Sequence, residues 1–257
     1  MLLKGKIALI TGGSSGVGAA TALRLGQLGA KVAINYCSSK AGAESVVAQI
    51  ETDGSEAMAL QGDVSREKDC VRLVDQTLER FGRLDVLINN AGTTTFVPHQ
   101  DLDGLTEEIW LRTLGVNLMG AFFMTRSAAP HLAVSGGGSV VMTSSIAGVT
   151  ANGSSIAYCA SKAGLNSLTR TLAKTLGRQG IRVNAVLPGL IDGDWAFNTW
   201  GGGDGAQYDE LKQQFLQQTP LSHVVTPEDV AEAIASFVTG SKYVTGQLLT
   251  LDGGFTL

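Results

Sequence analysis

Short apolar runs alternate with longer segments of helical periodicity along the whole of this 257-residue chain. Seven runs have the length and the nearly continuous apolar character of strands buried on both faces of a sheet. They span residues 6–10, 31–36, 56–61, 85–89, 139–143, 182–187 and 247–251. This alternation predicts a parallel sheet with right-handed crossover helices on both faces. We therefore expect an α/β fold, a doubly wound, Rossmann-like parallel sheet of about seven strands, in one domain covering residues 1–257.

Residues 190–205 do not fit the alternation. They contain Trp195, Phe197, Trp200 and three consecutive glycines, which make a poor core strand. The stretch is either a surface loop with packed aromatic side chains or a mobile lid over an apolar substrate. Because it follows the carboxyl end of a strand, where open α/β sheets bind ligands, we favour a substrate-binding loop or lid within residues 190–215.

Two helical segments show clear local signals. Residues 226–229 read Thr-Pro-Glu-Asp, which places a capping hydroxyl, a proline and two acids in the order of a helix start. In the segment 70–81, Val71, Val74 and Leu78 fall on one face, which we expect to be buried.

Composition restricts the possible partners and the location. A formal net charge of −4 gives no electrostatic reason to expect nucleic acid or an anionic membrane as a partner. The longest apolar stretches are strand-sized and residues 1–6 lead straight into the first strand, so we expect neither a membrane span nor a signal peptide. Cys37, Cys70 and Cys159 are odd in number and form no CxxC pair, which favours a reducing cytoplasm.

A glycine-rich turn, Thr-Gly-Gly-Ser-Ser-Gly-Val-Gly at 11–18, follows the first predicted strand and opens the first helix. A turn in this place can direct backbone N–H groups and the positive end of the helix at a pyrophosphate. No Lys-Ser or Lys-Thr follows, which disfavours a P-loop hydrolase. The spacing differs from the general dinucleotide fingerprint and also suits an ordinary turn, but its position favours dinucleotide binding. The candidate contacts are Gly12, Ser14, Ser15, Gly16, Val17 and Gly18.

The end of the second strand is expected to meet the adenine ribose of such a ligand. An acid there would bond the 2′-hydroxyl and select NAD, but the sequence after Tyr36 has none. Ser38, Ser39 and Lys40 could instead hold a 2′-phosphate, although they also suit a polar turn with a solvated lysine. Tyr36, at the end of the strand, is a further candidate cofactor contact. We therefore favour NADP(H) and keep NAD(H) as the alternative.

Tyr158 and Lys162 lie four residues apart in the helical segment 155–176, so both side chains share one face. A free tyrosine has a pKa of about 10, and a neighbouring positive charge lowers it. Such a tyrosine can give a proton to a forming alkoxide or take one from an alcohol. Ser145, just past the strand at 139–143, could hold the substrate oxygen beside it.

Each of these residues also has a commonplace explanation. A Tyr-x3-Lys pair is usually found on a helix surface, and a Ser-Ser pair after a strand is usually a turn. Their occurrence together with the glycine turn favours a catalytic site. Cys159 should point about 100° around the helix from Tyr158, which disfavours thiol catalysis. The three histidines are too dispersed for a metal site, and we expect none. They are His99, His131 and His223.

Taken together, the sequence resembles a short-chain dehydrogenase/reductase of the compact, single-domain kind over essentially all 257 residues. The resemblance rests on blocks that occur in the family's order. They are TGGSSGVG at 11–18, Asp63 in QGDVS, NNAG at 89–92, Asn117 in VNLMG, TSSIAG at 143–148, YCASK at 158–162, LPG at 187–189 and YVTGQLLTLDGG at 243–254.

The resemblance implies a catalytic tetrad and a set of cofactor contacts. The tetrad is carried over to Asn117, Ser145, Tyr158 and Lys162, with Ser145 preferred to Ser144 because it precedes the tyrosine by thirteen residues. Asn117 would support a water that links Lys162 to solvent, and Lys162 would also bond the nicotinamide ribose. Further implied contacts are Asp63 and Val64 to adenine, Asn90, Ala91 and Gly92 along the cofactor, and Pro188, Gly189 and Ile191 beside the nicotinamide.

The chain departs from many relatives five residues past the proline of LPG, where Gly193 replaces a threonine. We therefore expect no cofactor role for residues 192–194 and expect this stretch to rearrange on binding.

The overall pattern most resembles 3-oxoacyl-carrier-protein reductases and related carbonyl reductases, which implies NADPH-dependent reduction of a small-molecule ketone. NAD-dependent sugar, steroid and diol dehydrogenases share the motifs and stay open. The resemblance also implies a homotetramer with the C-terminal segment at an interface. A dinucleotide-sensing regulator without turnover is the alternative from another class, and it is disfavoured because Tyr158 and Lys162 are both present.

Overall fold

The computed structural model describes residues 2–257 and contains one parallel sheet of seven strands. The strands are β1 (Ile7–Ile10), β2 (Lys31–Tyr36), β3 (Ala57–Gln61), β4 (Val86–Asn89), β5 (Gly138–Thr143), β6 (Ile181–Pro188) and β7 (Leu248–Leu251). Their order is β3-β2-β1-β4-β5-β6-β7, and every adjacent pair is parallel. The doubly wound sheet predicted from the sequence is confirmed, with each strand end within one residue of its predicted place.

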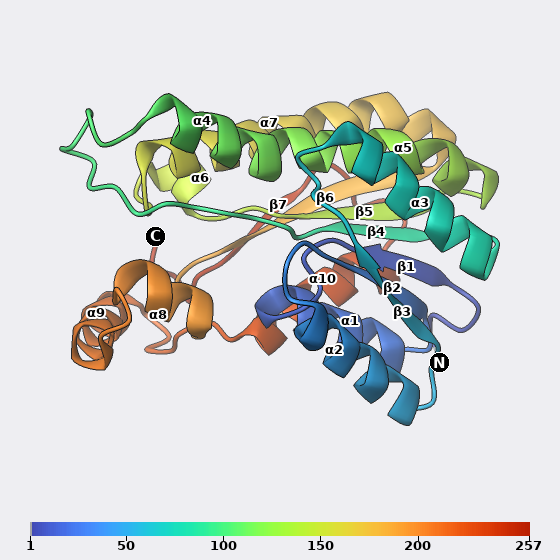
Figure 1. Cartoon of the computed structure of the whole chain (residues 1–257), viewed down its shortest axis with the longest axis horizontal. Coiled ribbons are helices and arrows are strands. Elements are labelled where there is room, and N and C mark those ends of the chain that lie inside the picture. Colours follow the sequence, from blue (N-terminus) through green and yellow to red (C-terminus); the bar gives the residue numbers. More distant parts are fainter. Residues whose placement is uncertain (1) are drawn as a thin grey trace.

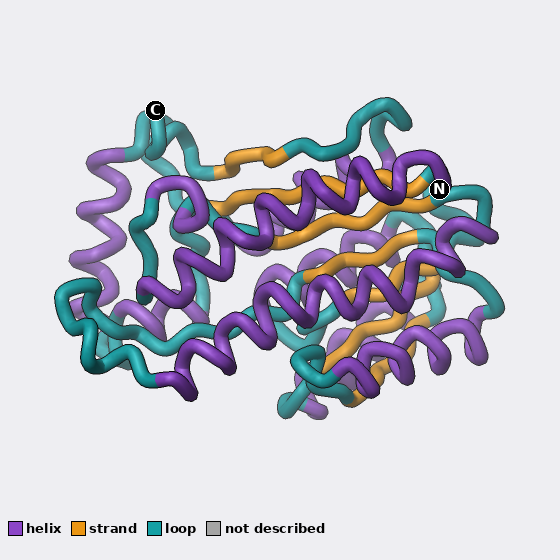
Figure 2. Tube along the Cα trace, turned by 90° about the horizontal axis from the view of Figure 1, so that it is seen from above, coloured by secondary structure: helices purple, strands orange, loops and turns teal. Residues whose placement is uncertain are grey.

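Two helical layers cover the sheet, as Figure 1 shows. One face carries α1 (Gly16–Gln27), α2 (Lys40–Thr52) and α10 (Pro227–Thr239), which pack on Ile10, Ile34 and Ile88. The other face carries α3 (Glu67–Phe81), α5 (Ala121–Val134) and α7 (Ile156–Leu176), which enclose the second hydrophobic cluster, and α4 (Glu107–Leu114), which packs against α7. In Figure 2 the strands run side by side with helices lying along them. Since all strands are parallel, their carboxyl ends meet at one edge of the sheet, with a topological switch between β1 and β4.

The helix start at Thr226 is confirmed as a reciprocal capping box. Thr226 Oγ1 accepts from the backbone N–H of Asp229 at 3.1 Å, and Asp229 Oδ2 accepts from the backbone N–H of Thr226 at 2.9 Å. Pro227 occupies the first helical position.

The predicted buried face of the segment 70–81 is partly wrong. In α3 the buried side chains are Cys70, Leu73, Val74 and Thr77, while Val71 is 43% exposed. The spacing i, i+3, i+4, i+7 is that of an amphipathic helix, but two of its positions hold a cysteine and a threonine. Thr77 can be buried because its hydroxyl donates to the carbonyl of Leu73 at 2.7 Å.

The segment 190–215, predicted as a loop or lid, is largely helical. It contains α8 (Asp194–Trp200) and most of α9 (Gly205–Gln218), which project beyond the end of the sheet (Figure 1). Asp204 caps α9, accepting from the backbone N–H groups of Ala206 at 2.8 Å and Gln207 at 3.4 Å. Gly202 and Gly203, with φ of 57° and 84°, supply the turn between the helices.

A charged cluster joins β1 to β4 at the amino ends of the strands. Asp85, only 4% exposed, accepts from Lys6 Nζ at 2.8 Å, from Arg83 Nη2 at 2.6 Å and from the backbone N–H of Ile7 at 3.0 Å. Burial opposes ionisation of this carboxyl, but these hydrogen bonds outweigh it and hold the pKa of Asp85 below its ordinary value.

Within residues 2–257, no helix combines the length and the apolar character needed to cross a membrane.

Candidate active site

The glycine turn after β1 has a shape that only glycine permits at two positions. Gly12 has a φ of 63°, and a methyl group on Gly18 would overlap the carbonyl oxygen of Gly12. The turn is tied to the end of β4, because Asn90 Nδ2 donates to the carbonyls of Thr11 and Gly12, both at 3.1 Å. Asn90 therefore supports the turn in addition to lying at the predicted cofactor edge.

The first turn of α1 presents a positive end with no internal counter-charge. Ser15 is its N-cap residue but makes no side-chain capping bond, and no acid lies in the first turn. The N–H groups of Gly16, Val17 and Gly18 thus lie where a helix lacks internal acceptors. A phosphate group fits this arrangement by charge and by hydrogen bonding.

Gly42, which sequence reasoning did not identify, lets α2 approach the glycine turn. A methyl group there would lie 2.7 Å from the carbonyl oxygen of Ser14 and 2.8 Å from Ser39 Oγ. The available signal was a glycine in the first turn of the helix after β2. The cradle formed by Gly12, Gly18 and Gly42 is one that added side chains would fill, and it suits the pyrophosphate of a dinucleotide.

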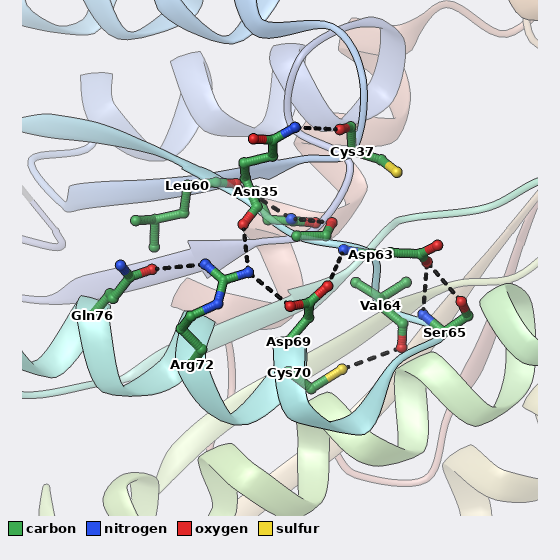
Figure 3. A network of polar contacts seen from close by, with 12 residues as sticks. Asn35, Cys37, Leu60, Asp63, Val64, Ser65, Asp69, Cys70, Arg72 and Gln76 are labelled. Carbon is green, nitrogen blue, oxygen red and sulfur yellow. Dashed lines mark hydrogen bonds and ion pairs between the residues drawn. The ribbon is translucent and has the colours of Figure 1, made fainter.

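Asn35 is a second residue whose role could not be predicted from the sequence. Buried at the end of β2, it accepts from the backbone N–H of Gly12 at 3.4 Å and donates to the carbonyl of Gly62 at 2.9 Å. It thereby joins the glycine turn to the loop after β3, within the network of Figure 3. Tyr36, predicted to contact the cofactor, is buried in the core on the α1–α2 face.

The predicted phosphate-binding group lies on the surface at the start of α2. Ser38, Ser39 and Lys40 are all exposed. Lys40 Nζ lies 3.5 Å from Glu44 Oε1, so its charge already has a partner.

Asp63 lies directly after β3, at the edge where an adenine contact is predicted. Its carboxylate is bound by Ser65 and Arg112. It accepts from the backbone N–H and the hydroxyl of Ser65 and pairs with Arg112 Nη1 at 2.7 Å. Partial burial opposes ionisation, but these bonds keep the pKa of Asp63 below its ordinary value. Val64 is buried and its carbonyl accepts from the Cys70 thiol at 3.2 Å.

A cavity of about 370 Å³ opens beside these residues, between the ends of β2 and β3 and the start of α3. Its lining is polar and charged. The lining residues are Cys37, Gln61, Gly62, Asp63, Arg66, Asp69 and Arg72.

Ser145, Tyr158 and Lys162 come together at the carboxyl ends of β5 and β6. The Ser145 side chain lies close enough to Tyr158 to lower the pKa of the phenol, and the backbone N–H of Ala147 donates to Ser145 Oγ at 3.1 Å. Lys162 Nζ lies 5.5 Å from the centre of the Tyr158 ring and donates to the carbonyl of Thr143 at 2.8 Å.

The pKa of the tyrosine differs from the expectation that a neighbouring positive charge lowers it. Burial raises the pKa of Tyr158 to about 12, with the Ser145 side chain acting in the opposite direction. Burial also lowers the pKa of Lys162 to about 8. At Tyr158 burial therefore outweighs the effect of Ser145, and the tyrosine is protonated at neutral pH.

Asn117 lies in a π-helical turn (Gly115–Gly120) between α4 and α5. Its Oδ1 accepts from the backbone N–H of Thr93 at 2.8 Å, and its Nδ2 donates to the Thr93 carbonyl at 2.9 Å and to Ser161 Oγ at 3.0 Å. A methyl group on Gly92 would lie 3.7 Å from Asn117 Oδ1 and 3.8 Å from Lys162 Nζ. The predicted tetrad is thus gathered around one point, and a π-helical turn at such a place is common in functional sites.

Aromatic side chains of α8 lie next to this site. Trp195, 49% exposed, has its ring centre 5.9 Å from that of Tyr158. Trp200 contacts Phe96 with ring centres 5.6 Å apart. The start of the segment is fixed by a bridge between Ile191 and Val225 and by the hydrogen bond from Gly189 N–H to the carbonyl of Leu251.

Of the two acids that follow Ile191, Asp192 is held by hydrogen bonds to α9. Asp192 accepts from Tyr208 Oη at 3.0 Å and pairs with Lys212, both on α9. The hydrogen bond from Lys212 is the main reason that the pKa of Asp192 is below its ordinary value. Gly193 has a φ of 148°, a region that other residues rarely adopt, so the local backbone accounts for a glycine at this position.

In residues 2–257 no three His, Cys, Asp or Glu side chains are grouped so that they could hold a metal ion. His99 Nε2 lies 3.0 Å from the carbonyl oxygen of Gly153, and His223 lies 3.5 Å from Asp229. Cys159 is buried next to Tyr158, and burial raises the pKa of its thiol.

Known proteins match this chain over nearly its full length. The family model described as enoyl-(acyl carrier protein) reductase matches residues 12–256. A Streptomyces violaceoruber protein assigned as ketoacyl reductase 2 of the granaticin polyketide synthase is 45% identical, covering 96% of this chain and 95% of its own. An L-rhamnose 1-dehydrogenase (NAD(P)(+)) from Sphingomonas is 40% identical over 98% of this chain and 97% of its own.

A solved structure agrees in fold as well as in sequence. The short-chain dehydrogenase from Burkholderia cenocepacia, in complex with NADP, is 38% identical, covers 100% of both chains and superposes with a TM-score of 0.88. The sheet order, the glycine turn and the Ser-Tyr-Lys cluster fit these matches. The chain therefore belongs to the short-chain dehydrogenase/reductase family and is an oxidoreductase acting on CH–OH and C=O groups.

Proposed function

We propose that the protein is an NADPH-dependent ketone reductase for 3-oxoacyl or related carbonyl substrates. The observation that carries the proposal is the placement of Lys162 5.5 Å from the centre of the Tyr158 ring, with Ser145 and Asn117 beside this pair. The 45% identity to a protein assigned as a ketoacyl reductase supports the substrate class.

In this proposal the hydroxyls of Ser145 and Tyr158 hold the substrate oxygen. The nicotinamide cofactor, when bound, supplies the hydride. Tyr158 gives its proton to the oxygen that becomes the alcohol, and the Lys162 ammonium stabilises the phenolate left behind. Asn117 positions the route by which a proton returns through Lys162. Buried donors fixed before the reaction stabilise charge better than water can.

The cofactor would lie along the edge from Ser145 to the loop after β3. Gly12, Ser14, Ser15, Gly16, Val17 and Gly18 would hold its pyrophosphate, and Asp63, Val64 and Asn90 to Gly92 its adenosine side and mid-section. Pro188, Gly189 and Ile191 would border the nicotinamide. The lack of an acid after β2 supports NADP(H), and the NADP complex of the Burkholderia cenocepacia protein supports the same choice.

Helices α8 and α9 would form the lid of the substrate site, within the predicted range 190–215. The contact between Trp195 and Tyr158 supports this role, because it places an exposed ring beside the proposed proton donor. A half-exposed tryptophan favours a substrate with an apolar part.

Substitution of Tyr158 by Phe tests the reaction. It removes only the hydroxyl, so the ring packing against Trp195 is kept. We expect the rate of ketone reduction with NADPH to fall roughly 10²–10⁴-fold while cofactor binding is retained. Reduction is followed by the loss of NADPH absorbance, and cofactor binding by protein fluorescence. Turnover near the parent rate in the variant would contradict the role of Tyr158.

A substrate panel separates the remaining alternatives. It comprises 3-oxoacyl thioesters, keto-esters, sugars, steroids and diols, each with NADPH or NADH and with NADP+ or NAD+. We expect the thioesters and keto-esters with NADPH to be fastest. Preferential oxidation of sugars would favour a sugar dehydrogenase, an alternative that the similarity to the Sphingomonas L-rhamnose 1-dehydrogenase supports. Cofactor binding with no turnover of any substrate would favour a dinucleotide-sensing regulator.

We also propose a homotetramer in the cytoplasm. Leu111, Met119 and Phe122 are exposed apolar residues on α4, the π-helical turn and α5, and Leu249 is exposed on the edge strand β7. These surfaces support interfaces on the α4–α5 side and at the C-terminal segment. The free thiols of Cys37, Cys70 and Cys159 are compatible with a reducing compartment.

A further inference from the structure

The cavity beside Asp63 brings together parts of the chain that are distant in sequence. Cys37 comes from the loop after β2, Gln61 to Asp63 from the end of β3, and Arg66, Asp69 and Arg72 from the start of α3. Figure 3 shows Cys37, Asp63, Asp69 and Arg72 around this space. The end of β2 is where an adenine ribose is expected, so the cavity lies beside that ribose.

Most charges around the cavity are already neutralised. Asp63 pairs with Arg112 at 2.7 Å, and Asp69 pairs with Arg72 at 2.8 Å. Arg72 also donates to the carbonyl of Gln61 at 3.0 Å, which fixes its guanidinium against β3.

Arg66 is the remaining cation of the lining. Within residues 2–257, its side chain makes no ion pair and no hydrogen bond, although its charge contributes to lowering the pKa of Asp69. Its backbone is fixed by the hydrogen bond from its N–H to the carbonyl of Asp63 at 2.9 Å. Its backbone is thus held beside the cavity, while the five N–H donors of its guanidinium are free for a ligand.

Lys40, the cation suggested by the sequence, is less suited to this role. It does not line the cavity, its side chain is 70% exposed, and it pairs with Glu44. A guanidinium binds phosphate through two parallel hydrogen bonds, which a lysine cannot do.

We propose that Arg66 binds the 2′-phosphate of NADP(H) and is the main determinant of cofactor choice. This inference rests on the proposed use of NADP(H) and assigns it to the start of α3 instead of the start of α2. It predicts that removal of the Arg66 charge weakens binding of NADP+ and leaves binding of NAD+ unchanged.

Cys37 supplies a readout that does not depend on turnover. It is the exposed cysteine of the three and lines the same cavity, whereas Cys70 and Cys159 are buried. In the native protein a disulfide reagent such as 5,5′-dithiobis(2-nitrobenzoate) should therefore label Cys37, and a bound dinucleotide should slow the labelling. The Cys37→Ser variant should lose the fast phase of labelling, which would assign that phase to Cys37.

The experiment measures the concentrations of NADP+ and NAD+ that halve the labelling rate. For Arg66→Gln we expect the NADP+ value to rise roughly tenfold or more, as for a lost charged hydrogen bond, and the NAD+ value to stay within about twofold. Lys68→Gln is the matched control, because it removes a charge two residues away on an exposed position outside the cavity. Its NADP+ value should change by less than about threefold, the size of a screened surface effect.

Three results would overturn the proposal. An equal loss for both dinucleotides in Arg66→Gln would assign the guanidinium to the adenine. A larger loss of NADP+ binding in Lys40→Gln than in Arg66→Gln would return the role to Lys40. Equal protection of the parent protein by NADP+ and NAD+ would mean that no residue selects the 2′-phosphate. None of these outcomes affects the assigned role of Tyr158, which the assay of Tyr158→Phe tests separately.

Discussion

At Tyr158 two opposing effects act on one hydroxyl. Burial raises its pKa to about 12, and the Ser145 side chain acts to lower it. The proton is therefore retained at neutral pH, which suits the proposed role of Tyr158 as the donor to a ketone oxygen. In that proposal Lys162, whose pKa burial lowers to about 8, would stabilise the resulting phenolate while it is charged.

The rate of ketone reduction should consequently fall as pH rises. Lys162 has a lowered pKa, so it is charged below about pH 8 and loses its charge above that value. The measurement is the pH profile of kcat/KM for reduction with NADPH, in which we expect a descending limb near pH 8. Lys162→Arg keeps the charge at all these pH values and should move the descending limb upward. A profile that stays flat to about pH 10 in the parent enzyme would show that the lysine charge does not limit the reaction.

At the scale of the elements, the carboxyl and the amino ends of the strands carry different kinds of residue. Their carboxyl ends carry the glycine turn, Asn90 and Ser145, whereas their amino ends are joined by the Asp85 cluster. Asp85 fixes β1 to β4, the two strands that flank the topological switch. A carboxylate at the opposite edge of the sheet thus joins the two strands between which the proposed cofactor site opens.

Asp85→Asn should lower the free energy of unfolding by about 1–3 kcal/mol at pH 7, since it weakens charged hydrogen bonds to Lys6 and Arg83. The folded-state pKa of Asp85 is lowered, so its stabilisation is present above the unfolded pKa of about 3.9 and is lost as pH falls through the folded value. Urea unfolding of parent and variant from pH 7 to pH 3 should show a difference that shrinks toward acid. A difference that stays constant over this range would assign the effect to packing instead of charge.

The same scale explains what the sequence could predict. Strands buried on both faces are continuous apolar runs, which is why 31–36 and 85–89 were located within one residue. The helices α8 and α9 were missed, because their ends depend on the Asp204 cap and on left-handed glycines and not on a long periodic pattern. The π-helical turn was missed for another reason. It is stabilised by bonds from Asn117 to Thr93 and Ser161, which are 24 and 44 residues away.

In the candidate site, too, the features fixed by local sequence could be predicted and those fixed by distant contacts could not. The positions of Ser145, Tyr158 and Lys162 were predicted from spacing and from the place of β5, since a helix and a strand end fix them locally. The ion pair of Asp63 with Arg112 joins residues 49 apart, and the cavity beside it involves three separate segments. No pattern within one segment contains that information.

For the whole molecule, the exposed apolar surfaces predict association. A homotetramer would cover Phe122 and its neighbours on the α4–α5 side and Leu249 on β7. Light scattering on the eluting protein should give about four times the chain mass of 26.7 kDa. Phe122→Glu should reduce this mass, because a charge in a buried apolar interface is unfavourable. Glu in place of the exposed Val149, outside these surfaces, is the matched control. A single-chain mass at tens of micromolar protein would contradict the tetramer.

The bridge between Ile191 and Val225 has an implication for how such a protein can diversify. Residues 192–224 leave and re-enter the fold at nearly the same point, and the backbone N–H of Asp192 bonds the carbonyl of Val225 at 2.9 Å. A segment closed at its base can change in length or composition at little entropic expense, about 0.6 kcal/mol for each doubling of a flexible loop. The dinucleotide half of the molecule lies outside this closure. With the proposed role of α8 and α9 as the lid, new substrate preferences could arise by exchange of this one segment, provided that its contacts from Trp195 to Tyr158 and from Trp200 to Phe96 are kept.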